Sequence, residues 1–317
     1  MFNQFIFFLF NKQIIIYENH RNVAPLLNNF NKHKFIFISA NPIWKILTLL
    51  GNRKLRDKAV LMVLKIINPI AILSMNWVSN RQHIYYVFAK QKRRDFIVVQ
   101  HGSYVGGIIT DEAHKYAQCT IMLCWSSFFV TTFKQLNPFA ITRFIEYGNP
   151  VYNMYDRDNF GYTNTPIDSI LLLPTYMKEN HVVERFKDFY HKLVSLGFTV
   201  VVGQHNYQKR FNPLGGVVVT DTTSLELLKA KKFDLIISDH SSALLDAIFF
   251  KNKILYFNAD VENTQNKYSQ FLENMASLKT DAISRDMITN LIHIKNQEAL
   301  FKELAGGYTK DNSITFL

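Results

Sequence analysis

Hydroxyl and carboxylate side chains are concentrated in one short turn that lies between an apolar run and a helical run. The apolar run Phe233–Ile237 is followed by Ser238, Asp239, His240, Ser241 and Ser242. A helical pattern then covers 243–250, and a second apolar run covers 254–257. This order predicts a β-α-β unit with a polar turn where its first strand meets its helix.

The residue types of this turn suit the binding of a phosphorylated ligand. In an open parallel sheet, ligands bind at the carboxyl ends of the strands, and the first turn of a helix offers unpaired N–H groups to a phosphate. Ser241 and Ser242 can cap the helix and donate to phosphate oxygens, and Asp246 can accept hydrogen bonds from ribose hydroxyls. A serine-capped helix after a core strand is also common, so this turn alone leaves a nucleotide site and a plain cap open.

A histidine with neighbouring glycines follows another expected strand. His101 comes directly after the apolar run 96–100, and Gly102, Gly106 and Gly107 lie close behind it. Glycine allows unusual dihedral angles and a close approach of the backbone to a ligand. Because the ordinary pKa of histidine lies near neutrality, His101 is a candidate general base.

Two more strand ends carry polar groups. His205 follows the apolar run 198–203, where it can contact a phosphate, complete an acid/base pair or simply lie in a loop. Pro174 ends the run 169–173, and Thr175 offers a hydroxyl directly after it. Taken alone, each of these two turns is weak evidence of a functional site.

The elements that must position these residues alternate between short apolar runs and helical patterns, which is typical of an α/β fold with parallel sheets. The expected strands are Gln13–Tyr17, Lys34–Ser39, His83–Phe88, Phe96–Gln100, Thr120–Cys124, Ser169–Pro174, Phe198–Gly203, Val217–Thr220, Phe233–Ile237 and Ile254–Phe257. The expected helices are Ile43–Leu50, Ala59–Ile67, Asp111–Tyr116, Phe128–Leu136, Val182–Leu196, Leu225–Ala230, Ala243–Phe250, Thr264–Leu278 and Ser284–Leu304.

The alternation is interrupted once, over residues 148–168, which are rich in Asn, Asp, Gly, Thr and Pro. The chain of 317 residues is long enough for two α/β domains. We therefore expect a domain over residues 1–155 and a second over residues 156–317. Two such halves joined by a linker imply a ligand cleft between them.

The charge balance favours an anionic partner. The formal net charge is +11, which fits nucleic acid, anionic lipid or phosphorylated substrates. We find no helix-turn-helix pattern, zinc-finger spacing or aromatic-basic strand motif, so nucleic acid is the least favoured of the three. Cys119 and Cys124 lie in an apolar stretch and are typical of buried thiols in a reducing compartment.

A membrane-spanning segment is not expected. The apolar stretch 2–10 has no basic flank, so it does not resemble a secretion signal, and it is too short to span a bilayer. The stretch 59–73 is interrupted by Lys65, Asn68 and Pro69, so it suits a core helix or an interfacial helix. A cytoplasmic protein attached to the anionic inner face of the plasma membrane fits this pattern.

The order of the polar turns along the chain resembles that of the CDP-glycerol glycerophosphotransferase family, which includes teichoic-acid and capsule enzymes. The resemblance covers about residues 96–260, roughly half of the chain. The matching motifs are His101-Gly102-Ser103, Gly148-Asn149-Pro150, Leu172-Leu173-Pro174-Thr175-Tyr176, His205-Asn206, Ser238-Asp239-His240-Ser241-Ser242 with Asp246, and Asn252–Phe257.

The resemblance implies a GT-B fold, in which two Rossmann-like domains face each other across a cleft, with the acceptor on the first domain and the nucleotide donor on the second. It implies a transferase that moves a polyol phosphate from a CDP-activated donor to a hydroxyl of a glycan, lipid-linked or teichoic-acid-like acceptor. His101 is then the catalytic base, and His205 contacts phosphate. The implied donor-binding residues are Gly102, Ser103, Thr175, Ser238, Asp239, Ser241, Ser242 and Asp246. No cofactor, essential metal or nucleic acid is expected.

Departures from the family pattern leave the donor open. Val151 and Asn153 stand where the family has Arg and Asp, His240 replaces a Tyr, and Asn206 replaces a Pro. A glycosyltransferase that uses a sugar nucleotide in capsule or O-antigen synthesis is the first alternative. A sugar-nucleotide epimerase or hydrolase and a basic nucleic-acid-binding protein are the others.

Overall fold

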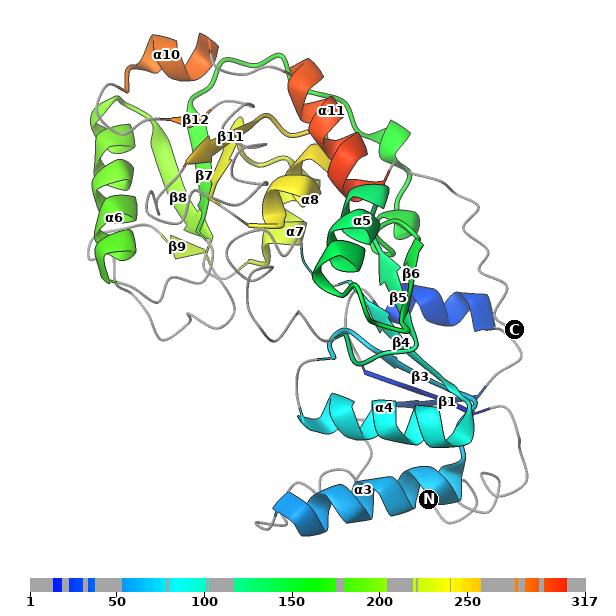
Figure 1. The fold of residues 1–317 in the computed structure, drawn as a ribbon. Helices are drawn as coiled ribbons and strands as arrows, with labels where there is room; N and C mark the ends of the chain where they lie inside the picture. Colours follow the sequence, from blue (N-terminus) through cyan, green and yellow to red (C-terminus); the bar gives the residue numbers. More distant parts are fainter. Residues whose placement is uncertain are drawn as a thin grey trace. The chain divides into compact units, whose positions relative to one another are not determined.

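The structure is a computed structural model whose described residues form two compact units, each built on a parallel six-stranded sheet (Figure 1). The first unit draws on residues 1–101, 110–155 and 305–317, and the second on 102–109 and 156–304. The described residues are 14–18, 23–30, 34–37, 53–77, 80–100, 102, 117–174, 180–203, 219–220, 222–239, 241–257, 277–278, 283–290 and 294–306. A boundary at 155/156 between separate domains stays a prediction.

The sheet of the first unit has the strand order β2-β1-β3-β4-β5-β6, and every neighbouring pair is parallel. Its strands are β1 (Ile14–Tyr17), β2 (Lys34–Phe37), β3 (Ala71–Ser74), β4 (Asp95–Val99), β5 (Ile121–Cys124) and β6 (Arg143–Glu146). Its helices are η1 (Ala24–Phe30), α3 (Arg53–Ile67), α4 (Asn80–Lys92) and α5 (Ser127–Leu136), with a 3-10 turn η4 (Tyr152–Met154).

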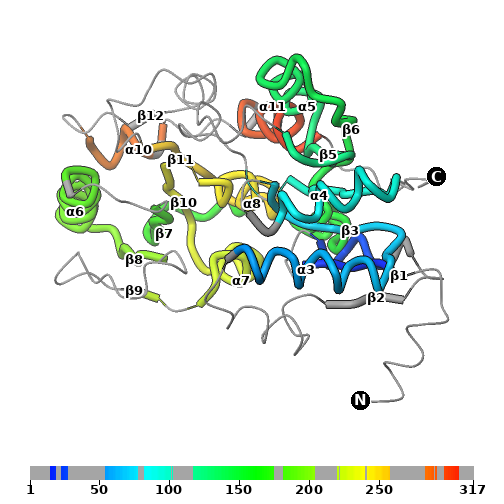
Figure 2. The backbone as a smooth tube through the Cα atoms, turned by 60° about the horizontal axis from the view of Figure 1, so that its bottom comes forward, coloured from blue at the N-terminus to red at the C-terminus, as the bar shows by residue number. Residues whose placement is uncertain are grey.

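Both faces of this sheet are covered, which explains why its central strands are apolar throughout. On one face, Leu73, Ile97 and Leu123 pack in a cluster to which Leu26 of η1 contributes. On the other face, the Tyr85 ring of α4 packs edge-on against Phe96 of β4. Helix α3 packs along α4 and forms an outer layer of this unit (Figures 1 and 2).

The sheet of the second unit has the order β12-β11-β10-β7-β8-β9 and is also parallel. Its strands are β7 (Ser169–Leu173), β8 (Thr199–Gly203), β9 (Val219–Thr220), β10 (Leu235–Ser238), β11 (Ile254–Phe257) and β12 (Ser277–Leu278). Its helices are η5 (Arg157–Asn159), α6 (Asn180–Ser195), α7 (Ser224–Ala230), α8 (Ala243–Phe249), α10 (Arg285–Asn290) and α11 (Ile294–Ala305).

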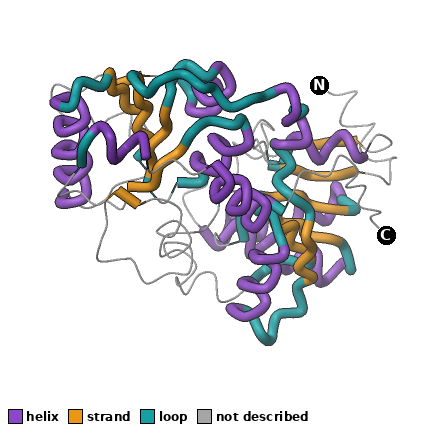
Figure 3. The backbone as a smooth tube through the Cα atoms, turned by 90° about the horizontal axis from the view of Figure 1, so that it is seen from above, coloured by secondary structure: helices purple, strands orange, loops and turns teal. Residues whose placement is uncertain are grey.

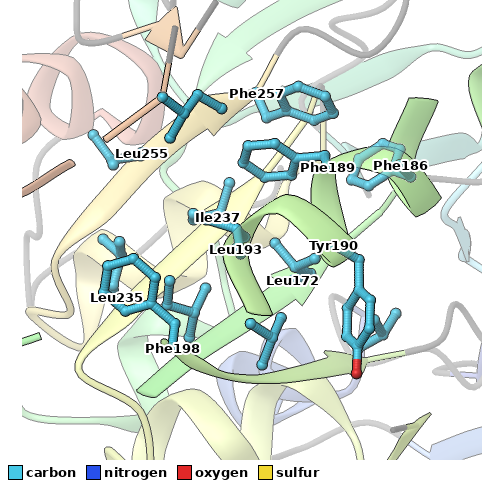
Figure 4. Packing of buried hydrophobic residues seen from close by; sticks show 14 of the residues in the cluster. Leu172, Phe186, Phe189, Tyr190, Leu193, Phe198, Leu235, Ile237, Leu255 and Phe257 are labelled. Atoms are coloured by element: carbon cyan, nitrogen blue, oxygen red, sulfur yellow. The ribbon is translucent and has the colours of Figure 1, made fainter. Parts of the chain in front are cut away.

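Successive side chains of a strand point to opposite faces of the sheet, so the core of the second unit has two parts, one on each face. Leu172, Ile237 and Phe257 point toward α6, where the Phe189 ring stacks on Phe257 with centroids 3.9 Å apart (Figure 4). Helix α8 covers the opposite face (Figure 1), and all seven of its residues are buried. Figure 3 shows helices beside the strands in each unit. The β10–α8 turn is therefore anchored at both of its ends in the core.

Arg157 fixes the start of the second unit to α8 and α11. Its guanidinium donates to the carbonyl oxygens of Ile248 and Phe249, each at 3.3 Å. It also contacts both carboxylate oxygens of Glu298, at 2.7 and 2.8 Å, and lies 4.6 Å from the Phe301 ring centroid. The arginine thus caps the carbonyl end of α8, where a cation is favoured.

One expected strand is wrong, because residues His83–Phe88 lie within helix α4. The aromatic and β-branched residues of this run favour a strand locally, but a short apolar run has no period that separates the two structures. In the fold, Tyr85 and Phe88 form the buried side of a helix that covers the sheet. Packing of that side against β3 and β4 overrides the local preference.

The structure also differs from the expected secondary structure in several other segments. Residues 277–278, expected at the end of a helix, form strand β12, and the single helix expected over 284–304 is divided into α10 and α11. Strands β3 and β6 were not expected; each has only four residues. The expected helices at 43–50 and 111–116 lie outside the described residues. Within the described part of the chain, no helix is long and apolar enough to cross a membrane.

Candidate functional site

The β10–α8 turn lies where the strand order of the second sheet reverses. Strand β7 has β8 on one side and β10 on the other, so the chain leaves β7 in one direction and later returns to its other edge. Ligands of open parallel sheets bind at such a switch point, outside the carboxyl ends of the strands. The Ser238 hydroxyl donates to the Leu173 carbonyl and ties the two carboxyl ends together.

The two serines of the turn have different roles in the structure. The Ser241 hydroxyl accepts a hydrogen bond from the Ala243 N–H at 3.2 Å, so Ser241 performs the capping. Ser242 adopts helical dihedral angles and its side chain makes no capping bond. Both serines are half-buried. The Ser242 hydroxyl is therefore the one that helix formation leaves available for a ligand.

Two carboxylates lie close to these serines in the sequence, and both are buried. Asp239 is 3% exposed and Asp246, in the first turn of α8, is 2% exposed. A ribose could therefore reach the Asp246 carboxylate only after a movement of the turn. The predicted ribose contact of Asp246 stays a prediction.

The structure brings one group of the predicted site residues together and does not test the others. Ser238, Asp239, Ser241, Ser242 and Asp246 lie in the strand–turn–helix segment formed by β10 and α8. Gly102 is described and partly exposed. His101, Ser103, Thr175 and His205 lie outside the described residues, so their assigned roles stay predictions.

The position before His101 is firmly held. Gln100, which ends β4, is completely buried, and its side-chain oxygen accepts from the Trp125 N–H at 2.8 Å. The Trp125 indole N–H donates back to the Gln100 carbonyl at 2.9 Å. This reciprocal pair joins the carboxyl ends of β4 and β5, so His101 follows a rigid anchor.

Sequence reasoning missed a carboxylate at the corresponding point of the first sheet. The strand order reverses between β1 and β3, and Glu18 directly follows β1. Glu18 Oε2 accepts from the Ser74 hydroxyl at 2.6 Å and from the Met75 N–H at 3.4 Å, while Oε1 accepts from Gln82 Nε2 at 2.9 Å. The sequence signal was a lone acidic residue after an apolar run.

The Gln82 side chain is only partly satisfied. Its nitrogen must face Glu18, because an ionised carboxylate only accepts hydrogen bonds. Its oxygen is then buried without a hydrogen-bond partner, in a residue that is 6% exposed. A buried acceptor without a donor is costly. As for Asp246, a ligand hydroxyl could reach this oxygen only after a local movement.

Cysteine and metal chemistry are not indicated in the described residues. Burial raises the pKa of the Cys119 thiol to about 12 and also raises the pKa of the Cys124 thiol, so neither forms a thiolate nucleophile near neutral pH. Among the residues described by the structure, no group of three His, Cys, Asp or Glu side chains is placed to hold a metal ion.

No protein-family model matches the chain, and no curated protein matches it in sequence. Solved structures are similar in fold. The wall teichoic acid polymerase TagF matches with a TM-score of 0.60 at 11% identity, over 95% of this chain and 86% of that one.

Two further solved structures are similar to this chain. The UDP-N-acetylglucosamine 2-epimerase of Rickettsia bellii matches with a TM-score of 0.53 at 10% identity, over 96% of this chain and 90% of that one. A glycosyltransferase of Rickettsia africae ESF-5 matches with a TM-score of 0.50 at 14% identity, over 96% of each chain. At these identities the likeness shows the fold: two parallel-sheet units of the GT-B class.

Proposed function

We propose that this protein is a transferase that binds a nucleotide-activated donor at the β10–α8 turn. The observation that carries the proposal is the placement of this turn at the switch point of the second sheet, with the Ser242 hydroxyl unused by the helix. The donor diphosphate would accept hydrogen bonds from Ser242 and from the N–H groups of the turn. Ser238 and Asp239 would hold the turn in place, and Asp246 would accept hydrogen bonds from the ribose after a movement of the turn.

The donor that we propose is CDP-activated, and the group transferred is a polyol phosphate such as glycerol phosphate. The collinear turns shared with the CDP-glycerol glycerophosphotransferases support this choice, and so does the fold shared with TagF, of which a variant was soaked with CDPG. The acceptor would be a hydroxyl of a cell-surface glycan or of a lipid-linked, teichoic-acid-like polymer.

The proposed reaction is a displacement at phosphorus. The acceptor oxygen forms a bond to the phosphorus that carries the polyol, and the bond from that phosphorus to the oxygen of CMP breaks. CMP leaves with the bonding electron pair, and His101 takes the proton of the acceptor hydroxyl. His205 and Ser242 would stabilise the charge on the phosphates, so positioning and electrostatics supply most of the acceleration.

Glu18 and Gln82 are the residues we propose for the acceptor side. Glu18 is oriented by three donors, and the Gln82 oxygen lacks one. A hydroxyl-rich acceptor would donate to both groups, which satisfies the buried amide and orients the acceptor. Neither residue needs to change its protonation state in this role.

A glycosyltransferase with a sugar-nucleotide donor is the second candidate. Val151 and Asn153 in the linker turn depart from the phosphotransferase pattern, and a glycosyltransferase and an epimerase share the fold. The same turn would then hold UDP or GDP, and the acceptor oxygen would attack a sugar carbon. Capsule or O-antigen synthesis would be the setting. For either candidate we propose peripheral attachment to the inner face of the plasma membrane, where a lipid-linked acceptor is found.

A thermal-shift screen tests the donor. The purified protein is heated with CDP, CMP, UDP, GDP, ADP, CDP-glycerol and CDP-ribitol in turn. A ligand at a hundred times its dissociation constant stabilises the native state by about 2.7 kcal/mol. We expect a selective shift with cytidine nucleotides that is lost in Ser242→Ala, whereas Ser195→Ala, which removes an exposed hydroxyl of α6, keeps it.

The other outcomes are equally decisive. A selective shift with UDP or GDP would replace the phosphotransferase by the glycosyltransferase. A shift that Ser242→Ala leaves unchanged would remove the β10–α8 turn from the donor site. If no nucleotide shifts the transition, the proposed function is wrong.

A further inference from the structure

Helix α3 carries exposed apolar side chains along one face. Leu55 is 54% exposed, Met62 is 63% exposed and Ile66 is 53% exposed. At about 100° per residue, these three positions and Ala59 fall within an arc of about 60° on the helix. They form one continuous apolar face along the helix.

The same helix buries its opposite side. Val60 is 5% exposed and Leu64 is fully buried, and α3 packs along α4 on this side (Figures 1 and 2). Val60 and Leu64 lie about 130° and about 170° around the helix from the centre of the exposed apolar face. The packing of α3 within its unit therefore does not account for the second apolar face.

Basic side chains lie beside the exposed apolar face. Lys54, Lys58 and Lys65 are exposed and follow one flank of the face. The helix has five basic residues and a single acidic one, Asp57, which contacts Arg56 at 3.9 Å. The face thus combines exposed apolar side chains with a row of positive charges.

We infer that this face of α3 binds the surface of an anionic membrane. Leu55, Met62 and Ile66 enter the boundary between headgroups and acyl chains, and the three lysines contact the lipid phosphates. An apolar face with a basic flank is the pattern of a helix that lies in the membrane interface. The inference extends the membrane attachment proposed above to one surface and does not depend on the donor.

Two other kinds of partner fit the face less well. A stable protein interface buries about 800 Å² on each partner, and three apolar side chains along one helix supply much less. Nucleic acid is bound through its phosphates by basic side chains, which leaves the apolar side chains without a role. A lipid surface uses both the apolar side chains and the lysines.

The test is co-sedimentation of the full-length protein with vesicles of phosphatidylcholine, with and without phosphatidylglycerol. We expect binding to the anionic vesicles. The triple variant Leu55→Gln, Met62→Gln, Ile66→Gln should lose at least about tenfold in partition coefficient, since loss of the burial of a single apolar side chain already costs about that factor. The matched control replaces Phe139 and Ile141, which are 98% and 68% exposed in the same unit, by Gln and should bind normally.

A second triple variant, with Lys54, Lys58 and Lys65 replaced by Gln, tests the charges. Each lysine near an anionic surface contributes about fivefold, so this variant should lose about a hundredfold on anionic vesicles and nothing on neutral ones. Thermal unfolding of all variants should match the wild type, because the replaced side chains are exposed.

Three outcomes would overturn the inference. The first is a wild-type protein that does not bind anionic vesicles. The second is an apolar triple variant that binds as well as the wild type, or a control that binds as poorly as the triple variant. The third is a wild-type dimer that the apolar triple variant converts to a monomer, which would assign the face to self-association. Nucleotide-dependent thermal shifts are measured separately, so failure here is distinguishable from failure of the proposed donor.

Discussion

Replacing Arg157 by Ala should destabilise the second unit by about 3 kcal/mol. The partly exposed pair with Glu298 contributes about 1 kcal/mol, and each hydrogen bond from the charged guanidinium to the α8 carbonyls contributes about 1.5 kcal/mol. Stacking on Phe301 adds about 0.5–1 kcal/mol. Release of the side chain returns up to about 2 kcal/mol of rotamer entropy. Arg157 makes all of these contacts within the second unit.

The loss should appear as a lower transition temperature in differential scanning calorimetry. For a unit of this size, 1 kcal/mol shifts Tm by about 2–4 °C, so we expect a decrease of about 6–12 °C. Arg157→Lys should recover part of the shift, because it keeps the charge but not the planar fork.

Arg285 is the matched control for Arg157. It also pairs with a carboxylate, Asp168, and its guanidinium lies 4.6 Å from the Phe198 ring centroid, but its side chain is 45% exposed. Arg285 also donates to the Ile167 carbonyl at 3.2 Å. Its exposed ion pair contributes about 0.5 kcal/mol, this hydrogen bond about 1.5 kcal/mol and the stacking about 0.5–1 kcal/mol, while release of the side chain returns about 2 kcal/mol. The net loss of about 0.5–1 kcal/mol should lower Tm by no more than about 4 °C in Arg285→Ala. Equal shifts for the two variants, or no shift for Arg157→Ala, would refute the reasoning.

Three more predictions concern Glu18, the two cysteines and Asp234. Glu18→Gln should lower kcat/KM for the acceptor about tenfold or more while the donor-induced thermal shift stays the same; an equal loss of donor binding would contradict an acceptor role. Cys119 and Cys124 should react with a thiol reagent at neutral pH only when the protein unfolds, because burial raises the pKa of both thiols; fast labelling of the native protein would refute this. Burial raises the pKa of Asp234, but hydrogen bonds from Ser169, the Asp168 N–H and Thr165 outweigh it, so the folded pKa lies below its ordinary value. Its stabilising contribution is therefore full above the unfolded pKa of about 3.9 and is lost as pH falls through the folded pKa. The Tm difference between wild type and Asp234→Asn should narrow at acid pH, and a constant difference would count against it.

The local sequence pattern was sufficient to predict the central strands of each unit. Runs such as Phe96–Gln100 and Phe233–Ile237 are apolar because strands of a parallel sheet are buried on both faces. The polar residues that follow them had to lie at the carboxyl edges. The α/β class with parallel sheets and the β10–α8 turn could therefore be predicted from residues that are neighbours in the sequence, whereas the GT-B fold was implied by the resemblance of the polar turns to those of a known family.

The local sequence pattern did not predict the secondary structure of segments whose conformation depends on packing against distant parts of the chain. Residues 83–88 form part of α4 because Tyr85 and Phe88 cover the sheet, which no property of that run by itself reveals. The four-residue strands β3 and β6 are also too short to be recognised alone. Their state depends on neighbouring strands that are distant in the sequence.

The chain by itself determined which segments are strands of a core and which turns carry hydroxyl groups, because burial and capping are set by nearby residues. Only the tertiary structure decided which side chains meet. Glu18 joins Ser74 and Gln82 across 56 and 64 positions, and Arg157 joins Glu298 across 141. It also showed that Leu55, Met62 and Ile66 of α3 are exposed. Such contacts depend on strand order and helix packing, which single-sequence periodicity does not encode.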